Sequence, residues 1–265
     1  MPEGDTILQA ATRLREAFDG AVLEAVEGSH PDVRREGRRL VGHRVTGVES
    51  VGKHLLVHVD RGWSLRTHLG MPGSWHLYRE GERWRRSPGA ARVVLRSGPW
   101  VAVCFAAPSV QIAPTPMVLE RIGHLGPDTI DDDFDAGEAV RRAGRLSDDT
   151  PAIDIVLDQR VMAGVGNVFA NEILFLEGIH PLRLLGTLDD AALSALVARA
   201  HRLLRANRSP GSRATTGSSR RGEELWVYGR SGRPCRRCGT PLAQGRGGAN
   251  RRVITWCPSC QGAAA

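Results

Sequence analysis

Four cysteines near the C-terminus form the clearest chemical pattern in this sequence. They lie in two Cys-x-x-Cys pairs separated by eighteen residues: Cys235, Cys238, Cys257 and Cys260. Four thiolates at this spacing can close a tetrahedron around zinc, with a β-hairpin between the two pairs. A redox dithiol needs only one pair, and a disulfide framework is typical of secreted chains. We therefore expect one structural Zn²⁺ without a catalytic role, which shapes a hairpin whose tip carries Arg251 and Arg252.

The N-terminus offers a second chemical possibility. Removal of Met1 would expose the secondary amine of Pro2, and a model α-amino group has a pKa of about 7.7 to 8.0. Such an amine can attack the C1′ atom of a sugar and form an iminium intermediate. The adjacent Glu3 is placed to act as general acid or base. Many proteins begin with Met-Pro for no chemical reason, so this start alone does not establish catalysis.

Lys53 is the only lysine among 36 basic residues, and the other 35 are arginines. This use of arginine indicates a GC-rich bacterial genome, in which a remaining lysine is unusual. A lysine ammonium is compact and its pKa responds to burial, whereas arginine stays charged. We therefore expect Lys53 to contact a phosphate or a transferred proton, the alternative being chance survival of one lysine.

The positive charge is concentrated in one part of the chain. The segment from Arg199 to Arg252 holds fourteen arginines and two acids, a net +12 in a chain of net charge +7, so the remainder carries −5. This asymmetry favours contact with a nucleic-acid backbone over a merely solvated basic face. No apolar run approaches the roughly 18 residues of a membrane span. The acidic start lacks the pattern of a secretory signal, and the paired cysteines suit a reducing compartment, so we expect a cytoplasmic, nucleoid-associated protein without membrane contact.

The order of elements predicts a multidomain α+β chain. Asp5 is expected to cap a helix over residues 6–18, and Gly, Asp and Pro punctuate the short β-type runs that follow, as in a β-sandwich. These runs span residues 21–26, 44–51, 54–59, 63–69, 91–95 and 100–105. The proline-bearing stretch 107–116 is interpreted as the connection out of the sandwich, and Cys104 as a core residue. Helical periodicity returns over 153–160, 167–176 and 189–206, and the polar stretch 209–222 is expected to be a mobile loop.

Five motifs, taken in order, resemble the formamidopyrimidine-DNA glycosylase and endonuclease VIII family, and the likeness covers nearly the whole chain. They are the start Met1-Pro2-Glu3-Gly4-Asp5-Thr6, Gly52-Lys53-His54-Leu55-Leu56, His68-Leu69-Gly70-Met71, the segment 164–172 (Gly-Val-Gly-Asn-Val-Phe-Ala-Asn-Glu), and Tyr228-Gly229-Arg230 ahead of the cysteines.

The resemblance implies three domains: an N-terminal helix with a catalytic β-sandwich (1–115), a helix-two-turns-helix DNA-binding domain (116–222) and a zinc-ribbon finger (223–265). It also implies that Pro2 forms a Schiff base with the sugar and that Glu3 assists base loss. Lys53 and Asn167 would contact phosphate, and either Arg252 or Arg251 would be the finger arginine. Met71 would fill the space left by an extruded base, although a methionine beside glycines is also common in packing.

The implied activity is that of a bifunctional DNA glycosylase and abasic-site lyase of base excision repair, with β,δ-elimination. Its partner would be damaged double-stranded DNA, and we expect a monomer. The Pro-Glu-Gly-Asp-Thr start resembles the endonuclease VIII branch, which prefers oxidised pyrimidines, whereas residues 68–71 resemble the branch that prefers oxidised purines. Pyrimidines are favoured here. The alternatives are the same chemistry on purines, or a zinc-containing damage sensor without catalysis.

Overall fold

The computed structural model describes residues 2–209, 211 and 213–263. The chain divides into two compact units, residues 1–124 and 125–265. The three-domain division at residues 115 and 222 remains a prediction. Within the described ranges, no helix is both long enough and apolar enough to cross a membrane.

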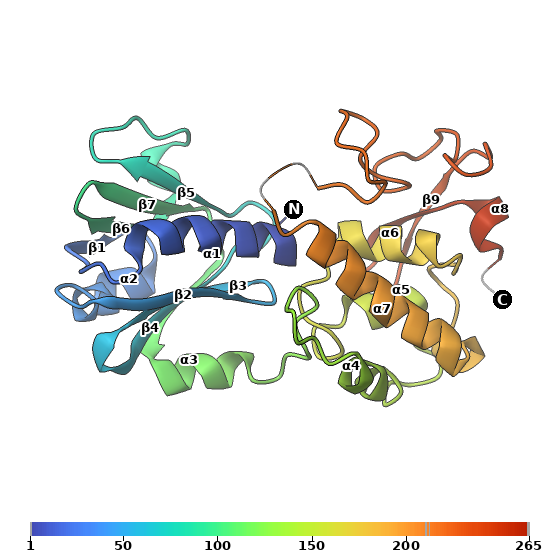
Figure 1. Cartoon of the computed structure of the whole chain (residues 1–265), viewed down its shortest axis with the longest axis horizontal. Coiled ribbons are helices and arrows are strands. Elements are labelled where there is room, and N and C mark those ends of the chain that lie inside the picture. Colours follow the sequence, from blue (N-terminus) through green and yellow to red (C-terminus); the bar gives the residue numbers. More distant parts are fainter. Residues whose placement is uncertain (1, 210, 212, 264–265) are drawn as a thin grey trace. The chain divides into compact units, whose positions relative to one another are not determined.

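The first unit contains two antiparallel sheets, which lie on either side of α1 in Figure 1. One sheet has the strand order β2-β3-β4-β8 and the other β1-β6-β7-β5. The strands are β1 (Ala25–Glu27), β2 (Val45–Val51), β3 (His54–Val59), β4 (Trp63–His68), β5 (Ser74–Arg79), β6 (Ala91–Ser97), β7 (Trp100–Phe105) and β8 (Ser109–Pro114). The helices are α1 (Gly4–Phe18), α2 (Pro31–Glu36) and α3 (Thr115–Ile122), with 3₁₀ turns η1 (Gly37–Arg39), η2 (Asp60–Gly62) and η3 (Pro88–Ala90). The predicted sandwich is confirmed.

One apolar core joins the inner faces of both sheets to α1. Alternate residues along the strands face inward, as the period of two requires, and α1 adds Ile7, Ala11, Leu14 and Phe18 at helical spacing. Cys104 is fully buried in this core, as expected. The outer face of the β1-β6-β7-β5 sheet carries a second apolar cluster, which includes Tyr78 and Phe105 and is covered by Trp84.

Several elements of the first unit differ from the prediction. The helix begins at Gly4, so Asp5 lies in its first turn and is not the N-cap. Only the end of the expected 21–26 strand is paired as β1. The stretch 107–116 does not merely leave the sandwich, because it contains β8, which pairs with β4 along its whole length. Prolines at 108 and 114 stand just before and at the end of that strand, positions where a missing N–H is tolerated.

The second unit is helical, with a hairpin at its C-terminal end. Its elements are α4 (Ala136–Ala143), α5 (Ala152–Leu157), α6 (Asn167–Leu176), η4 (Leu185–Thr187), α7 (Asp190–Ala206), β9 (Ala243–Gly247), β10 (Arg252–Trp256) and α8 (Pro258–Gln261). The bounds of α6 match the prediction, and Asp189 caps α7 by accepting from Ala192 N at 2.7 Å. Helix α5 ends at Leu157, earlier than expected, because the Asp158 carboxylate accepts from the Arg160 amide at 2.8 Å and turns the chain.

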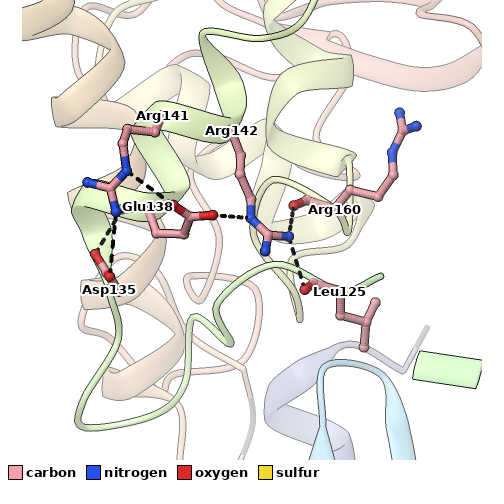
Figure 2. Close-up of polar contacts among 6 residues, drawn as sticks. All are labelled: Leu125, Asp135, Glu138, Arg141, Arg142 and Arg160. Atoms are coloured by element: carbon pink, nitrogen blue, oxygen red, sulfur yellow. Dashed lines mark hydrogen bonds and ion pairs between the residues drawn. The ribbon is translucent and has the colours of Figure 1, made fainter. Parts of the chain in front are cut away.

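Helix α4 is hydrogen-bonded to two segments of the chain, one that precedes α5 in the sequence and one that follows it. Figure 2 shows Arg142 reaching from α4 to the carbonyls of Leu125 and Arg160, at 3.1 and 2.9 Å. Glu138, one turn earlier, accepts from Arg142 Nε at 2.7 Å and pairs with Arg141 at 3.1 Å. These bonds fix the start of the turn that leads from α5 into α6.

Candidate active site and cysteine cluster

Helix α1 and strand β2 run in opposite directions. Gly20, just after the helix, donates to Val45 O at 3.0 Å, whereas Arg15 donates to Val48 O at 2.9 and 2.6 Å. The end of α1 therefore lies beside the start of β2, and earlier residues of α1 lie beside later residues of β2. The start of α1, with Pro2 and the fully buried Glu3, consequently lies toward the end of the unit at which β2 finishes.

Lys53 occupies the two-residue turn at that same end. Val51 pairs with His54, so Gly52 and Lys53 form the connection between β2 and β3. Gly52 has φ +57° at the first central position, a left-handed conformation that glycine adopts at little cost. The tight turn presents the lysine at the rim of the sheet.

Two histidines lie directly beside Lys53. His54 begins β3 and pairs with His68 at the end of β4, with ring centroids 4.9 Å apart. The charge of Lys53 contributes to lowering the pKa of both rings, after burial, which is the largest cause for each. The pKa of His54 is lowered to about 3, so this imidazole is neutral at physiological pH.

Arg66 is a buried cation that sequence reasoning missed. It is 6% exposed, and its guanidinium donates to Gln111 Oε1 at 3.1 Å, His54 Nδ1 at 3.1 Å and Ser109 Oγ at 3.2 Å. Each of these acceptors is neutral, so the charge is not cancelled by a directly bonded carboxylate. Together with Lys53, it makes this end of the sheet attractive to an anion. The signal was present in the alternation of β4, where Ser64, Arg66 and His68 share a face.

Met71 is the most exposed large apolar side chain among those described, at 72%. It lies in the turn between β4 and β5, three residues after His68. Gly73 N donates to Leu69 O at 2.9 Å and closes the turn, and Gly70 has φ +57°. The candidate residues Pro2, Glu3, Lys53 and Met71 thus lie in the first unit, the last two on turns at the same sheet end.

The four predicted cysteines gather at one point of the second unit. All four sulfurs lie within 4.8 Å of one another, and three of the Sγ pairs are 3.5, 3.5 and 4.0 Å apart. A disulfide would need about 2.05 Å, whereas four thiolates around zinc at about 2.3 Å stand about 3.8 Å from each other. The amides of Arg237 and Cys260 point at Cys235 Sγ and Cys257 Sγ, at 3.4 Å each. The donor set and its spacing fit a closed tetrahedral metal site.

Strands β9 and β10 form the expected hairpin between the cysteine pairs. Arg251 lies in its turn with φ +46°, and Arg252 is the first residue of β10; both are exposed. The tip is anchored on α5, because Asp154 Oδ2 accepts from Ala249 N at 2.8 Å. Gly248 approaches so closely that a Cβ there would collide with Asp154 Oδ1.

Asn167 begins α6 and connects it to the hairpin. Its Nδ2 donates to Val253 O at 2.9 Å, while its buried Oδ1 has no partner among the described residues. Asn171, one turn later, accepts from Thr255 N at 2.6 Å. Upstream, Gly164 with φ +97° packs against Asp128 and Leu204, which shapes the turn before the helix.

Glu172 lies within one of the five sequence motifs, but the sequence alone does not indicate its role. This fully buried carboxylate accepts from the amides of Trp226, Val227 and Tyr228, at 2.7 to 2.9 Å, and from the Thr215 hydroxyl. Burial raises its pKa, and these donors oppose the rise. Residues 210 and 212 of the expected mobile loop lie outside the described residues. Its central part has fixed contacts, since Thr215 bonds to Glu172 and Ala214 bonds to Asn207.

Two family models match this chain. The formamidopyrimidine-DNA glycosylase N-terminal domain matches residues 1–108, and the H2TH domain of the same enzymes matches residues 125–216. A probable endonuclease 8 2 from Streptomyces coelicolor is 40% identical over 98% of this chain and 94% of its own length. The chain belongs to the formamidopyrimidine-DNA glycosylase family.

Within the formamidopyrimidine-DNA glycosylase family, the similarity extends to both branches. A DNA-(apurinic or apyrimidinic site) lyase Nei2 from Mycolicibacterium smegmatis is 38% identical over 98% of this chain and 99% of the relative. A formamidopyrimidine-DNA glycosylase from Moorella thermoacetica is 34% identical over 93% of this chain and 94% of the relative. The higher identities support the endonuclease VIII branch.

The fold matches that of solved members of the formamidopyrimidine-DNA glycosylase family. The Lactococcus lactis enzyme, solved in complex with DNA containing an abasic site, aligns with a TM-score of 0.84 at 20% identity, over 98% of this chain and 100% of that one. At this identity the likeness supports the fold alone.

Proposed function

We propose that this protein is a bifunctional DNA glycosylase and abasic-site lyase of base excision repair, with Pro2 as its nucleophile. The observation that carries the proposal is the arrangement at one end of the first unit. The start of α1 lies toward the end of the sheet where the Lys53 turn stands, beside a buried cation and two histidines whose pKa values are lowered. For a member of this family, the arrangement provides an amine (Pro2), an acid (Glu3) and a cation suited to bind phosphate (Lys53) in one unit.

The chemistry follows from these groups. The Pro2 amine attacks C1′ of the damaged nucleotide and loses its proton as the base leaves with one; the C1′–O4′ bond then opens, and a cationic iminium (Schiff base) forms between Pro2 and the sugar. Glu3, which follows Pro2 directly and is fully buried at the start of α1, supplies or removes protons at the sugar as the ring opens. The cationic iminium then allows loss of the 3′ phosphate by β-elimination and of the 5′ phosphate by δ-elimination.

The partner in this proposal is damaged double-stranded DNA. C1′ is not open to attack inside the base stack, so the nucleotide must be extruded at a cost of a few kcal/mol. The exposed Met71 is suited to fill the vacated space. Lys53, Asn167 and one of the two hairpin arginines would hold the backbone, and Asn167 keeps a second amide hydrogen for a phosphate oxygen. We place the enzyme in the cytoplasm at the nucleoid, where its DNA is, and as a monomer.

The cysteine cluster would hold one Zn²⁺ through all four thiolates. A metal with four protein ligands has no site for substrate, so its contribution is to stabilise the hairpin that carries Arg251 and Arg252. Arg252 is favoured as the finger arginine because it lies five residues before Cys257, and Arg251 is the close alternative. The lesions favoured are oxidised pyrimidines, which is supported by identities of 40% and 37% to relatives named endonuclease 8 2, against 34% to a formamidopyrimidine-DNA glycosylase.

Borohydride trapping tests the proposed function. Untagged protein, shown by mass spectrometry to lack Met1, is mixed with a duplex that contains one abasic site, and sodium borohydride is added. We expect a covalent protein–DNA adduct in which peptide mapping finds the sugar on Pro2. The Pro2→Gly variant is expected to lose base excision by at least about 100-fold while it still binds the duplex.

A matched control is the same protein with an uncleavable extension ahead of Met1, which turns the Pro2 nitrogen into an amide. It should bind DNA and give no adduct. If the processed protein binds abasic DNA and forms no adduct, the alternative of a damage sensor without chemistry is the correct one. A panel of duplexes with oxidised pyrimidines and oxidised purines then measures the lesion preference.

A further inference from the structure

The turn that carries Met71 depends on contacts from outside itself. Gly70 has φ +57° and packs against Pro108, and Gly73 is held against the backbone of Leu69. These contacts fix the two ends of the turn. The peptide between them, which carries Met71 and Pro72, projects into solvent, with Met71 72% exposed.

Arg86 reaches this projecting peptide from another part of the first unit. Its Nη1 donates to the carbonyl oxygen of Pro72 at 2.9 Å and to Ser74 Oγ at 3.0 Å. Its guanidinium carbon stands 5.6 Å from the ring centroid of Phe105 on β7, so the side chain also lies over an aromatic face. One nitrogen thus bridges the residue after Met71 to the first residue of β5.

The loop that supplies Arg86 is itself firmly attached to the sheet. Trp84 stacks on Tyr78 with centroids 6.3 Å apart and meets the edge of Phe105 at 5.7 Å. The amide of Arg85 donates to the Tyr78 hydroxyl at 3.0 Å, and His76 Nδ1 lies 2.8 Å from the same hydroxyl. A guanidinium held from this base can resist displacement of the turn.

A side chain that replaces an extruded base meets such a displacing force, because the neighbouring bases gain free energy by restacking. The Met71 side chain can withstand this force only if its own backbone is held in place. The carbonyl of Pro72 is the first backbone acceptor after Met71, and Arg86 donates to it from its side chain.

We propose that Arg86 is a positioning residue for base extrusion: it holds the Met71 turn against the push of the duplex and does not touch the reacting atoms. This inference rests on the proposed function, since it assigns Arg86 to the extrusion step of that reaction. It follows that Arg86 matters for a lesion in a duplex and not for the same lesion in a single strand, where no stack opposes extrusion.

The experiment compares wild type with Arg86→Met, which keeps an unbranched stem over Phe105 and removes the donors. The probe is an oligonucleotide that carries 5,6-dihydrouracil next to 2-aminopurine, used as a duplex and as a single strand. Fluorescence of 2-aminopurine reports extrusion, and single-turnover product formation reports excision. For Arg86→Met we expect a loss of about tenfold in both signals on the duplex, and excision from the single strand within about twofold of wild type.

Three further variants separate positioning from charge and from folding. Arg85→Met removes one positive charge from the same loop and keeps the Arg85 amide that donates to the Tyr78 hydroxyl, so duplex excision should stay near the wild-type rate. Arg86→Lys restores an ammonium with several donors and should recover most of the loss. In an Arg86→Met/Met71→Ala double variant, the two losses should not add, because both act on one turn.

Equal losses on duplex and single strand for Arg86→Met would overturn the proposal, as would additive losses in the double variant or full duplex activity in Arg86→Met. Failure of the proposed function gives a different pattern. In that case the wild type raises 2-aminopurine fluorescence on the duplex without excising the base, and the comparison of variants by fluorescence still decides the role of Arg86. A wild type that does not extrude the base at all contradicts the inference directly.

Discussion

At the scale of single residues, the unusual feature of the first unit is a buried arginine bonded to neutral groups. Burial of a charge is expensive, so a cation without a bonded carboxylate is seldom kept for stability alone. Arg66 fixes the state of His54, because a guanidinium can only donate and the imidazole Nδ1 must accept. The proton of His54 is therefore on Nε2, and the ring stays neutral beside Lys53. The result is a neutral imidazole held beside the fixed positive charge of Arg66.

This arrangement predicts a pH dependence of stability. Burial lowers the pKa of His54 from 6.5 to about 3 in the folded chain, with the charges of His68 and Arg66 adding to the effect. Below pH 6.5 the unfolded chain binds a proton that the folded chain does not, so the free energy of unfolding falls as the pH drops toward 3. By pH 5 the loss from this residue is about 2 kcal/mol. Urea unfolding at pH 7 and pH 5 measures the loss.

The comparison that isolates His54 is the variant His54→Gln, whose amide oxygen can still accept from Arg66 and which has no group to titrate. Its stability should fall less than that of wild type between the two pH values, by about 2 kcal/mol. Identical pH dependence in the two proteins would mean that His54 takes up its proton in the folded state near its ordinary pKa.

Sequence could identify these residues only in part. Lys53 was singled out by type, since one lysine among arginines is visible in a composition, whereas Arg66 is one of 35 arginines and has no such mark. Its role depends on Gln111 and Ser109, which come from β8, a strand that was interpreted as a connection. Without that pairing, the partners of Arg66 could not be inferred.

At the scale of elements, tight turns do much of the positioning. Lys53 and Met71 each follow a glycine with φ +57°, and Arg251 itself adopts positive φ at the end of the hairpin turn. Non-glycine residues adopt this conformation at a cost, so other contacts must hold the hairpin tip in place. Asp154 on α5 provides such a contact through the Ala249 amide.

We therefore expect Asp154→Ala to loosen the hairpin tip. Loss of the acceptor should weaken the tip by about 0.5 to 1.5 kcal/mol, the usual net value of one hydrogen bond. Hydrogen exchange at Ala249 should speed up accordingly, and affinity for an abasic-site duplex should fall severalfold because Arg251 and Arg252 lose their fixed position. Metal content should be unchanged, since the cysteines lie at the other end of the hairpin.

Asp154→Asn is the matched control, because its side-chain oxygen can still accept from Ala249 while the negative charge is gone. It should keep the protection of that amide. If the Ala249 amide exchanges as slowly in Asp154→Ala as in wild type, the hairpin tip is held by its own strands and Asp154 is not its anchor.

The elements that sequence predicted well are those with local signals. Helix α6 has matching bounds because Gly166 precedes it and apolar residues follow at helical spacing, and α7 has Asp189 as its cap. Strand β5 and helices α2, α3 and α4 were missed. These elements are too short for a helical or strand period to be recognised in the sequence. In β5, aromatic and charged residues are mixed because both of its faces are covered in part.

At the scale of the whole molecule, charge and chemistry are divided between the two units. The proposed nucleophile, its acid and Lys53 belong to the first unit, whereas the arginine-rich segment and the cysteines belong to the second. The concentration of positive charge was visible in the sequence from the position of fourteen arginines, a signal that requires no structure. How the cysteine module is held could not be foreseen, because it packs on Phe175 of α6 and depends on the buried Glu172 to fix residues 226–228.

We expect removal of the metal to unfold the cysteine module of the second unit and to leave the first unit folded. The cysteine module has a small apolar cluster of its own, so zinc binding supplies much of its folding free energy, and structural sites of this kind contribute on the order of 10 kcal/mol. Metal analysis should find one zinc per chain, and a chelator should remove protection from the β9 and β10 amides while the β2, β3 and β4 amides stay protected. DNA affinity should drop when the hairpin unfolds, because the hairpin presents Arg251 and Arg252.

Cys238→Ser should reproduce this state without chelator, whereas Cys104→Ala, which alters the core of the first unit, should retain the zinc. Equal loss of protection in both units on chelation would show instead that the sandwich cannot fold without the metal-bound module.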